Sequence, residues 1–236
     1  MVKVGDKISA DNSSWSFGGD VHKNFDSHVQ KSVPQYFIGH DIIEKMSDFF
    51  LTKNCYVYDV GCSTGTLLNK LAIRHQNKNI NFIGCDVEKG MVASAKEKCK
   101  KFKNVKVINE SILNFPLKKS NLIYSYYTIQ FIHPSVRQEI FNKIYESLNW
   151  GGAFIFFEKV RGPDARFQDI MSLVYNEYKL DQGYSPDEII GKSRSLKGVM
   201  EPFSTQGNID LAMRSGFKDV TTIFKYVCFE GFLAIK

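Results

Sequence analysis

The sequence lacks any long apolar run. No stretch of its 236 residues approaches the roughly 20 consecutive apolar residues that a membrane-spanning helix needs. Residues 1–20 also lack the apolar segment of a secretory signal. We therefore expect a protein without a membrane partner.

Cysteine is sparse and unpatterned. The five cysteines are an odd number, scattered along the chain without a C-x-x-C pair. This excludes a zinc ribbon or a regular disulfide framework and favours a reducing, cytoplasmic location. The histidines show no metal-ligand spacing, so we predict no metal site.

An arginine-rich patch with interleaved aromatic residues is also missing, although the net charge is +6. The densest run of lysines, over residues 96–106, falls on a predicted helix and its exit. Such a run is typical of a solvated helix face. The sequence therefore disfavours a nucleic-acid groove.

What is present is the pattern of one α/β domain over residues 1–236. Hydrophobic residues make up 43% of the chain and charged residues 24%, which is normal for a globular protein. Apolar runs alternate with helical spacing, which predicts a doubly wound, mostly parallel sheet. Two closing strands, over 217–226 and 227–236, bring the expected sheet to seven strands. We predict the other strands at 55–60, 80–85, 105–109, 121–127 and 153–159, with helices at 65–76, 88–101 and 134–149.

Two segments fall outside this alternation. Residues 21–52 predict two helices interrupted at Pro34, which precede the first core strand as N-terminal cap helices. Residues 160–205 predict a helical lid after the fifth strand, with Ser185 or Asp187 starting one of its helices. Residues 1–20 are polar, and we expect a loose segment or one that orders over a ligand. The lid is also our candidate for a homodimer surface.

The chain is organised around residues 57–65. An apolar run ends in Asp59 and is followed by Gly61-Cys62-Ser63-Thr64-Gly65 and then by apolar residues at helical spacing. This predicts a strand, a tight turn and a helix. Glycine permits the sharp turn and the close approach of a ligand. The free N–H groups at the helix start then face that ligand.

The loop distinguishes between two cofactor classes. A dinucleotide site requires G-x-G-x-x-G, but no third glycine follows Gly65. The carboxylate of Asp59 would repel a pyrophosphate and suits a cationic ligand. The pattern resembles the D-x-G-x-x-x-G motif of class I S-adenosylmethionine (SAM)-dependent methyltransferases. Asp86 ends the next apolar run, where a carboxylate binds ribose hydroxyls or caps the following helix.

Several segments together resemble one narrower family, the carboxy-S-adenosylmethionine synthases. The resemblance covers the chain from about residue 21 to its end. The matching segments are Phe25-Asp26, Ser32-Val33-Pro34-Gln35-Tyr36, Tyr58-Asp59-Val60-Gly61-Cys62-Ser63, Tyr127-Thr128-Ile129-Gln130-Phe131, Lys143-Ile144-Tyr145-Glu146-Ser147-Leu148-Asn149, Glu158-Lys159, Gly183-Tyr184-Ser185 and Val199-Met200.

That family resembles methyltransferases in fold but makes a modified cofactor. The resemblance implies that SAM and prephenate react to attach a carboxyl group to the sulfonium methyl, for use in tRNA wobble-uridine modification. It also implies which residues line the cofactor site: Tyr36, Gly61, Cys62, Ser63 and Asp86. Ile112 matches the family at the third strand tip.

This chain departs from the family pattern at four places. Val87 replaces an asparagine of the family pattern, Ser111 replaces an acidic residue, and Tyr126 replaces a second asparagine. The family's lid carries a Lys-Arg pair whose arginine grips the new carboxylate. Here the lid reads Lys192-Ser193-Arg194, and a displacement by one residue rotates a helical side chain by about 100°.

Three functions are therefore weighed. The departures favour a SAM-dependent methyltransferase that acts on a small-molecule acceptor. The alternative is a carboxy-SAM synthase that acts on SAM and prephenate, with Arg194 reaching the site from a shifted lid. The third is a noncatalytic SAM-binding or RNA-associated subunit. Basic residues near the expected cleft, including Arg194, hint at an acidic small molecule.

The candidate catalytic residues follow from the chemistry. Methyl transfer requires alignment of the nucleophile, and a general base only where the nucleophile must lose a proton. His133 is the candidate base, or else the residue that precedes a helix beginning with proline. Glu158 ends the fifth strand and is either catalytic or ion-paired with Arg161. The complete cofactor prediction comprises Tyr36, Asp59, Gly61, Cys62, Ser63, Gly65, Asp86, Val87, Ser111, Ile112 and Tyr126.

Overall fold

The computed structural model describes residues 2–5 and 8–236. Its main sheet has seven strands, and only the last two run antiparallel to their neighbours. The predicted fold class is confirmed, including the closing antiparallel hairpin. The strands in spatial order are β5 (Val105–Asn109), β4 (Asn81–Asp86), β3 (Tyr56–Val60), β6 (Ser120–Tyr126), β7 (Leu148–Lys159), β9 (Phe229–Ile235) and β8 (Asp219–Tyr226).

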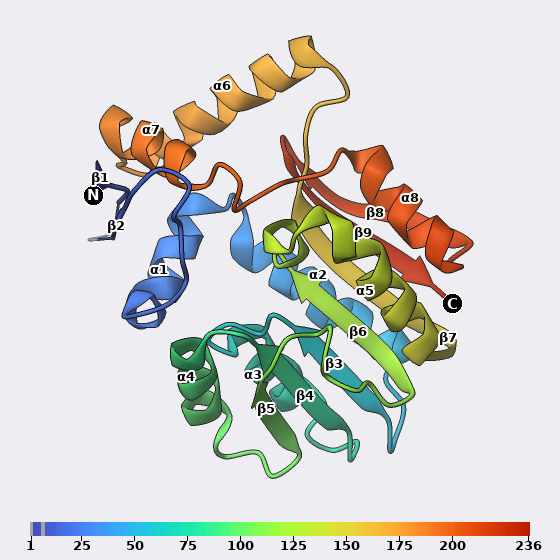
Figure 1. The fold of residues 1–236 in the computed structure, drawn as a ribbon. Helices are drawn as coiled ribbons and strands as arrows, with labels where there is room; N and C mark the ends of the chain where they lie inside the picture. The colour runs from blue at the N-terminus through green and yellow to red at the C-terminus, as the bar shows by residue number, and fades with distance from the viewer. Residues whose placement is uncertain (1, 6–7) are drawn as a thin grey trace.

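Helices cover both faces of this sheet (Figure 1). Alternate residues of each strand point to opposite faces, so neighbours such as Phe156 and Phe157 enter different cores. Phe157 packs on the side of α2 (Tyr36–Phe50), α3 (Thr66–Arg74) and α4 (Lys89–Cys99). Phe156 packs on the side of α5 (Pro134–Ser147) and α8 (Thr205–Ser215). Both phenylalanines are fully buried, which fixes the register of β7.

The fifth strand, predicted over 153–159, begins earlier in the structure, so that residues 149–152 lie inside β7. The pairing with β6 shifts between Ser120 opposite Leu148 and Leu122 opposite Ala153. The four residues between those pairs bulge out, and Gly151 has φ +75°. Since the Gly151 N–H donates to Lys236 O at 2.7 Å, the bulge stays attached to the end of the chain.

Two helices precede the first strand of the main sheet, as predicted. They are α1 (Val21–Ser32) and α2, separated at Pro34. Before them, β1 (Val2–Lys3) and β2 (Ser9–Ala10) form a short antiparallel pair. The segment after β2 is ordered against the lid, because Ser13 N donates to Arg194 O at 3.0 Å and Trp15 N to Ser195 O at 3.1 Å.

The lid is helical, as predicted, and consists of α6 (Ala165–Asp181) and α7 (Pro186–Ser195). Figure 1 shows both helices at one end of the molecule, with β1 and β2 beside α7. Ser185 starts α7 through a reciprocal capping box with Glu188. Within the described ranges, no helix has the length and apolarity needed to cross a membrane.

Candidate cofactor site

A cleft of about 210 Å³ opens at the carboxyl ends of the parallel strands. Ligands of open α/β sheets bind at this edge, because loops there leave a crevice between the two helix layers. The cleft brings together ten of the eleven predicted cofactor residues. They are Tyr36, Asp59, Gly61, Cys62, Ser63, Asp86, Val87, Ser111, Ile112 and Tyr126.

The glycine loop after β3 turns as predicted. Gly61 has φ +76° and Gly65 has φ +74°, in the left-handed region that glycine adopts readily. The N–H groups of Gly61 and Cys62 both donate to Cys85 O, at 2.8 and 3.0 Å, which fixes the loop to β4. Gly65 does not line the cleft; it begins α3, where a Cβ would lie only 2.8 Å from that of Ala95.

Asp86 lies at the end of β4 and faces the glycine loop. Its Oδ2 accepts the Ser63 N–H at 2.8 Å and its Oδ1 accepts the Glu88 N–H at 2.9 Å. The carboxylate therefore orients the loop and the start of α4 together. Each oxygen keeps a further lone pair toward the cleft, so a bound ribose remains compatible with these contacts.

Asp59 lies on the floor of the cleft and is 2% exposed. Burial raises the pKa of its carboxyl well above the usual value. No lysine or arginine in the described ranges forms an ion pair with it. A ligand that carries an ammonium or sulfonium group would supply the missing positive charge.

The wall of the cleft contains buried polar atoms without partners. Both ring nitrogens of His40 and the hydroxyl of Tyr127 lack hydrogen bonds among the described residues. Burial lowers the pKa of His40 to about 3, so its imidazole is neutral. The ring lies 4.7 Å from those of Tyr36 and Tyr126, measured between centroids. These polar atoms, with the carboxyl groups of Asp59 and Asp86, fit a polar and partly cationic cofactor such as SAM.

The acid expected from the resemblance at the third strand tip is present one residue earlier. Glu110 lines the cleft beside Ser111. Its Oε1 accepts the Ser111 N–H at 2.9 Å and the Asn114 Nδ2 at 3.2 Å. Sequence matching position by position missed Glu110, although it follows directly after the last residue of β5.

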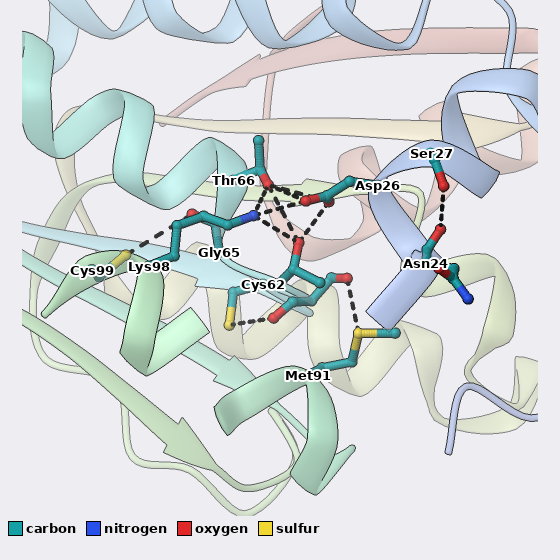
Figure 2. Close-up of polar contacts among 11 residues, drawn as sticks. Asn24, Asp26, Ser27, Cys62, Gly65, Thr66, Met91, Lys98 and Cys99 are labelled. Carbon is teal, nitrogen blue, oxygen red and sulfur yellow. Dashed lines mark hydrogen bonds and ion pairs between the residues drawn. The ribbon is translucent and has the colours of Figure 1, made fainter. Parts of the chain in front are cut away.

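A polar cluster attaches the cap helix α1 to the glycine loop (Figure 2). Asp26 accepts hydrogen bonds from the Thr64 hydroxyl at 2.7 Å and the Thr66 hydroxyl at 3.2 Å. Lys98 Nζ lies 2.8 Å from Asp26 Oδ2 and 3.3 Å from the Thr64 hydroxyl. One lysine of the 96–106 run is therefore not purely solvated, because α1 supplies it with a carboxylate.

A second cavity of about 530 Å³ adjoins the cofactor cleft under the lid. The two share an aromatic wall: Phe17, Phe25, Tyr36, Tyr126, Tyr127 and Phe131. Five cations also line the second cavity, and among the described residues no aspartate or glutamate does. The cations are Lys159, Arg161, Lys179, Lys192 and Lys197.

The three predicted catalytic residues lie outside both cavities. His133 is exposed and caps α5, where its side chain accepts the Ser135 N–H. The helix-start interpretation of His133 is therefore the one the structure supports. Pro134 is the first residue of α5, so His133 directly precedes the helix and its imidazole lies at the helix start.

Glu158 is 3% exposed and lies beneath the 3₁₀ turn Ile129–Phe131. Its Oε1 accepts the Ile129 N–H at 3.1 Å. The predicted ion pair with Arg161 is wrong, since Arg161 pairs with Glu201 at 3.4 Å. Strand alternation turns Glu158 inward, whereas Arg161 follows the strand and faces the lid side.

Arg194 is exposed and lines neither cavity. Lys192, two residues earlier, lines the second cavity instead. Its Nζ lies 4.6 Å from the centroid of the Trp15 ring and 3.3 Å from the Ser32 hydroxyl. The sequence predicted in part that Arg194 would not reach the site, because its displacement by one residue on a helix turns the side chain through about 100°.

Sequence reasoning missed the aromatic wall and the lysines of the second cavity. Phe17, Phe25 and Phe131 come from three separate segments that no local motif connects. Lys179 lies on α6, and the only local indication of its position was its spacing with Tyr175, which places both residues on one face of the helix.

Comparison with known proteins identifies the family. Residues 57–152 match the model of a methyltransferase domain. The chain is 37% identical over 223 residues to a carboxy-S-adenosyl-L-methionine synthase of Staphylococcus epidermidis, covering 94% of this chain and 97% of that protein. A protein of the same name from Sulfurimonas denitrificans is 36% identical over 236 residues, covering 99% and 100% of the two chains.

Solved structures show the same fold at low identity. The pyocyanin biosynthetic protein PhzM superposes with a TM-score of 0.66 at 14% identity, over 92% of this chain and 58% of that one. Human N-acetylserotonin methyltransferase in complex with SAM gives 0.54 at 15% identity, over 77% and 47%. The chain thus spans about half the length of these two structures. The methyltransferase fold, a cleft that suits SAM and the full-length relatives agree: this enzyme uses SAM as its cofactor and belongs to the carboxy-S-adenosyl-L-methionine synthase family.

Proposed function

We propose that this enzyme is a carboxy-SAM synthase. Prephenate loses CO₂ and hydroxide to become phenylpyruvate, the hydroxide takes a proton from the sulfonium methyl of SAM as water, and the methyl carbon bonds to the CO₂ to give carboxy-SAM. The observation that carries the proposal is the cationic second cavity, which adjoins the cofactor cleft across a shared aromatic wall. A cavity of about 530 Å³ is in the range for a small-molecule site.

The charges favour an anionic second substrate. SAM carries a positive sulfonium, and five lysine or arginine residues line the neighbouring cavity. Like charges repel strongly where water is excluded. A dianion between SAM and the Lys159–Lys179 pair compensates both sides, whereas a neutral acceptor leaves that repulsion unrelieved; Arg161 already pairs with Glu201 at 3.4 Å. This argument favours a dicarboxylate such as prephenate over a neutral methyl acceptor.

The residues of this chain bind and orient the two reactants. When bound, SAM supplies the methyl carbon that receives the new carboxyl group. Asp59 compensates the positive end of the cofactor, and Asp86 receives its ribose hydroxyls. Phe17 closes the wall between the cavities, and the backbone bond from Trp15 N to Ser195 O at 3.1 Å holds that segment on the lid.

Methyl transfer to a small-molecule acceptor is the second candidate function. One observation favours it: Arg194, the residue nearest the family's carboxylate-gripping position, points away from both cavities. Val87, Ser111 and Tyr126 also replace family residues in the cleft. The carboxy-SAM proposal places Lys192 in the role of the missing arginine.

Product analysis separates the candidates. The purified enzyme is incubated with SAM and prephenate, and the nucleosides are identified by mass spectrometry. Carboxy-SAM, heavier than SAM by one CO₂, is the expected product and requires both reactants. Formation of S-adenosylhomocysteine with an acceptor, and no carboxy-SAM, would support methyl transfer. SAM binding without either product would indicate the noncatalytic subunit.

We also propose a homodimer formed through the lid, in a reducing, cytoplasmic setting. One face of α6 exposes Phe167, Ile170, Leu173 and Val174, spaced as a helical stripe. An apolar stripe of this kind is typical of a contact with a second copy. Light scattering should give a dimer mass for the native chain and a monomer mass for Leu173→Glu. A monomeric native chain at micromolar concentration would contradict the proposal.

A further inference from the structure

Two ammonium groups meet at one aromatic ring in the second cavity. The Nζ of Lys159 lies 4.3 Å from the centroid of the Tyr175 ring, and that of Lys179 lies 4.5 Å from it. Lys159 comes from the end of β7 and Lys179 from the lid helix α6. The Tyr175 ring is fixed in place because its hydroxyl donates to Ser32 O at 2.7 Å.

Neither lysine is neutralised within the described part of the chain. No carboxylate of the described residues forms an ion pair with Lys159 or Lys179, although Lys179 is only 6% exposed. The ring of Tyr175 stabilises a nearby cation, but by much less than burial costs an unpaired charge.

The groups around Lys179 account for the lowered pKa of its ammonium group. Burial, followed by the charge of Lys159, lowers the pKa of Lys179 to about 8, and the Cys228 thiol acts in the opposite sense. Tyr175 and Lys159 are the other polar groups that face it from α6 and β7. Two adjacent ammonium groups, of which Lys179 is buried and Lys159 half-buried, are costly to fold when no described carboxylate compensates them, and an anionic ligand removes that cost.

We propose that Lys159, Lys179 and Tyr175 form a carboxylate-binding subsite that selects a dianionic substrate over a monoanionic one. The identity of the natural ligand rests on the function proposed above; the subsite itself does not. Lys192 stands apart from this pair, beside Trp15 and Ser32. The cavity therefore has cations at two places, and the Lys159–Lys179 pair alone forms the proposed subsite.

Kinetics of Lys179→Met test the subsite. Methionine keeps the volume and removes the charge, so KM for prephenate should rise about 10- to 100-fold, the loss expected for a hydrogen bond to a charged group. The SAM dissociation constant should not change. The variant should also melt at a higher temperature than the native enzyme, because an unpaired buried charge has gone. Lys179→Arg should recover part of the affinity.

The control is Lys103→Met, an exposed lysine outside both cavities, which should leave KM and SAM affinity as they are. A merely structural Lys179 would lower the melting temperature in Lys179→Met and leave KM unchanged. That result would overturn the subsite.

A binding experiment separates this inference from the proposed function. Isophthalate and benzoate share a ring but carry two carboxylates and one. Calorimetry on the native enzyme should show tighter binding of isophthalate, and Lys179→Met should abolish the preference. Binding should weaken above about pH 8, where Lys179 loses its proton.

If the native enzyme forms no carboxy-SAM but keeps the Lys179-dependent preference for isophthalate, the proposed function fails and the subsite stands. If carboxy-SAM forms with the same KM in native enzyme and Lys179→Met, and the preference is absent, the function stands and the subsite is refuted.

Discussion

Lys98 Nζ lies 2.8 Å from Asp26 Oδ2, an ion pair that joins α4 to α1 across the glycine loop. Both side chains are partly exposed, at 31% and 45%, so solvent weakens the pair. The pair matters because its carboxylate also binds the glycine loop. Thr64, inside the glycine turn, and Thr66, directly after it, donate to the same carboxylate; Figure 2 shows Thr66 and Lys98 beside Asp26.

We predict that Asp26→Asn weakens SAM binding by about 1 kcal/mol, roughly fivefold, because the loop loses its attachment to the cap helix. Calorimetry with SAM measures this change. Lys98→Met should cost a similar amount, and the double variant should cost less than the sum of the two. Asp41→Asn removes the Asp41–Lys70 ion pair, of which neither residue lines the cofactor cleft, and is the matched control. Equal effects of Asp26→Asn and Asp41→Asn on SAM affinity would exclude a role of the cluster in binding.

Asp86→Ala should weaken SAM binding by about 1.5–3 kcal/mol, the range for a hydrogen bond to a charged group. The carboxylate contacts Ser63 N and Glu88 N and lines the cleft. Asp86→Asn keeps one acceptor oxygen for the loop and should lie between the native enzyme and the alanine variant. An unchanged dissociation constant in a folded Asp86→Ala protein would place Asp86 outside the ribose site.

Stability should decrease with rising pH because of Glu158. Burial raises the pKa of its carboxyl from 4.5 to about 8, a shift that Arg137 only partly opposes. Between these values the folded protein holds a proton that the unfolded chain has released. The free energy of unfolding therefore falls as pH rises through this window.

Glu158→Gln removes this contribution and still accepts the Ile129 N–H. Urea unfolding at pH 5 and pH 8 should show the native protein losing stability relative to the variant. The difference isolates Glu158, since every other group titrates in both proteins. Parallel curves for the two proteins would mean that Glu158 is ionised in the fold.

Substitutions of Lys192 and of Arg194 should affect cofactor binding differently. Lys192→Met should weaken binding of carboxy-SAM about tenfold or more and spare SAM, because only the former leaves a carboxylate unpaired. Arg194→Ala should affect the two cofactors alike, since Arg194 is exposed and lines neither cavity. Titration of each variant with both cofactors measures the ratio. A selective loss of carboxy-SAM binding in Arg194→Ala would assign that role to the arginine.

Local features were predictable because they depend on neighbouring residues. The strand, glycine turn and helix at residues 57–65 follow from periodicity and from the backbone freedom of Gly61 and Gly65. Asp59 and Asp86 could be predicted to lie in one site, because parallel strands end at one edge of a sheet. The start of α7 at Ser185 followed from its capping box.

Side-chain direction was less predictable. His133 and Glu158 have the residue types of catalysis and lie near strand ends, yet one caps a helix and the other supports a buried turn. Their directions depend on where α5 begins and on how β7 registers against β6. A residue type alone does not contain that information.

The sequence by itself determined the fold class and the glycine loop with Asp59 and Asp86, because short-range periodicity and turn chemistry specify them. Only the tertiary structure decided that Lys159, Lys179 and Lys192 share one cavity. They stand on β7, α6 and α7, and their meeting depends on how the lid packs against α1 through contacts such as Tyr175 to Ser32. Such contacts join residues far apart in the chain, and no local pattern encodes the distance between them.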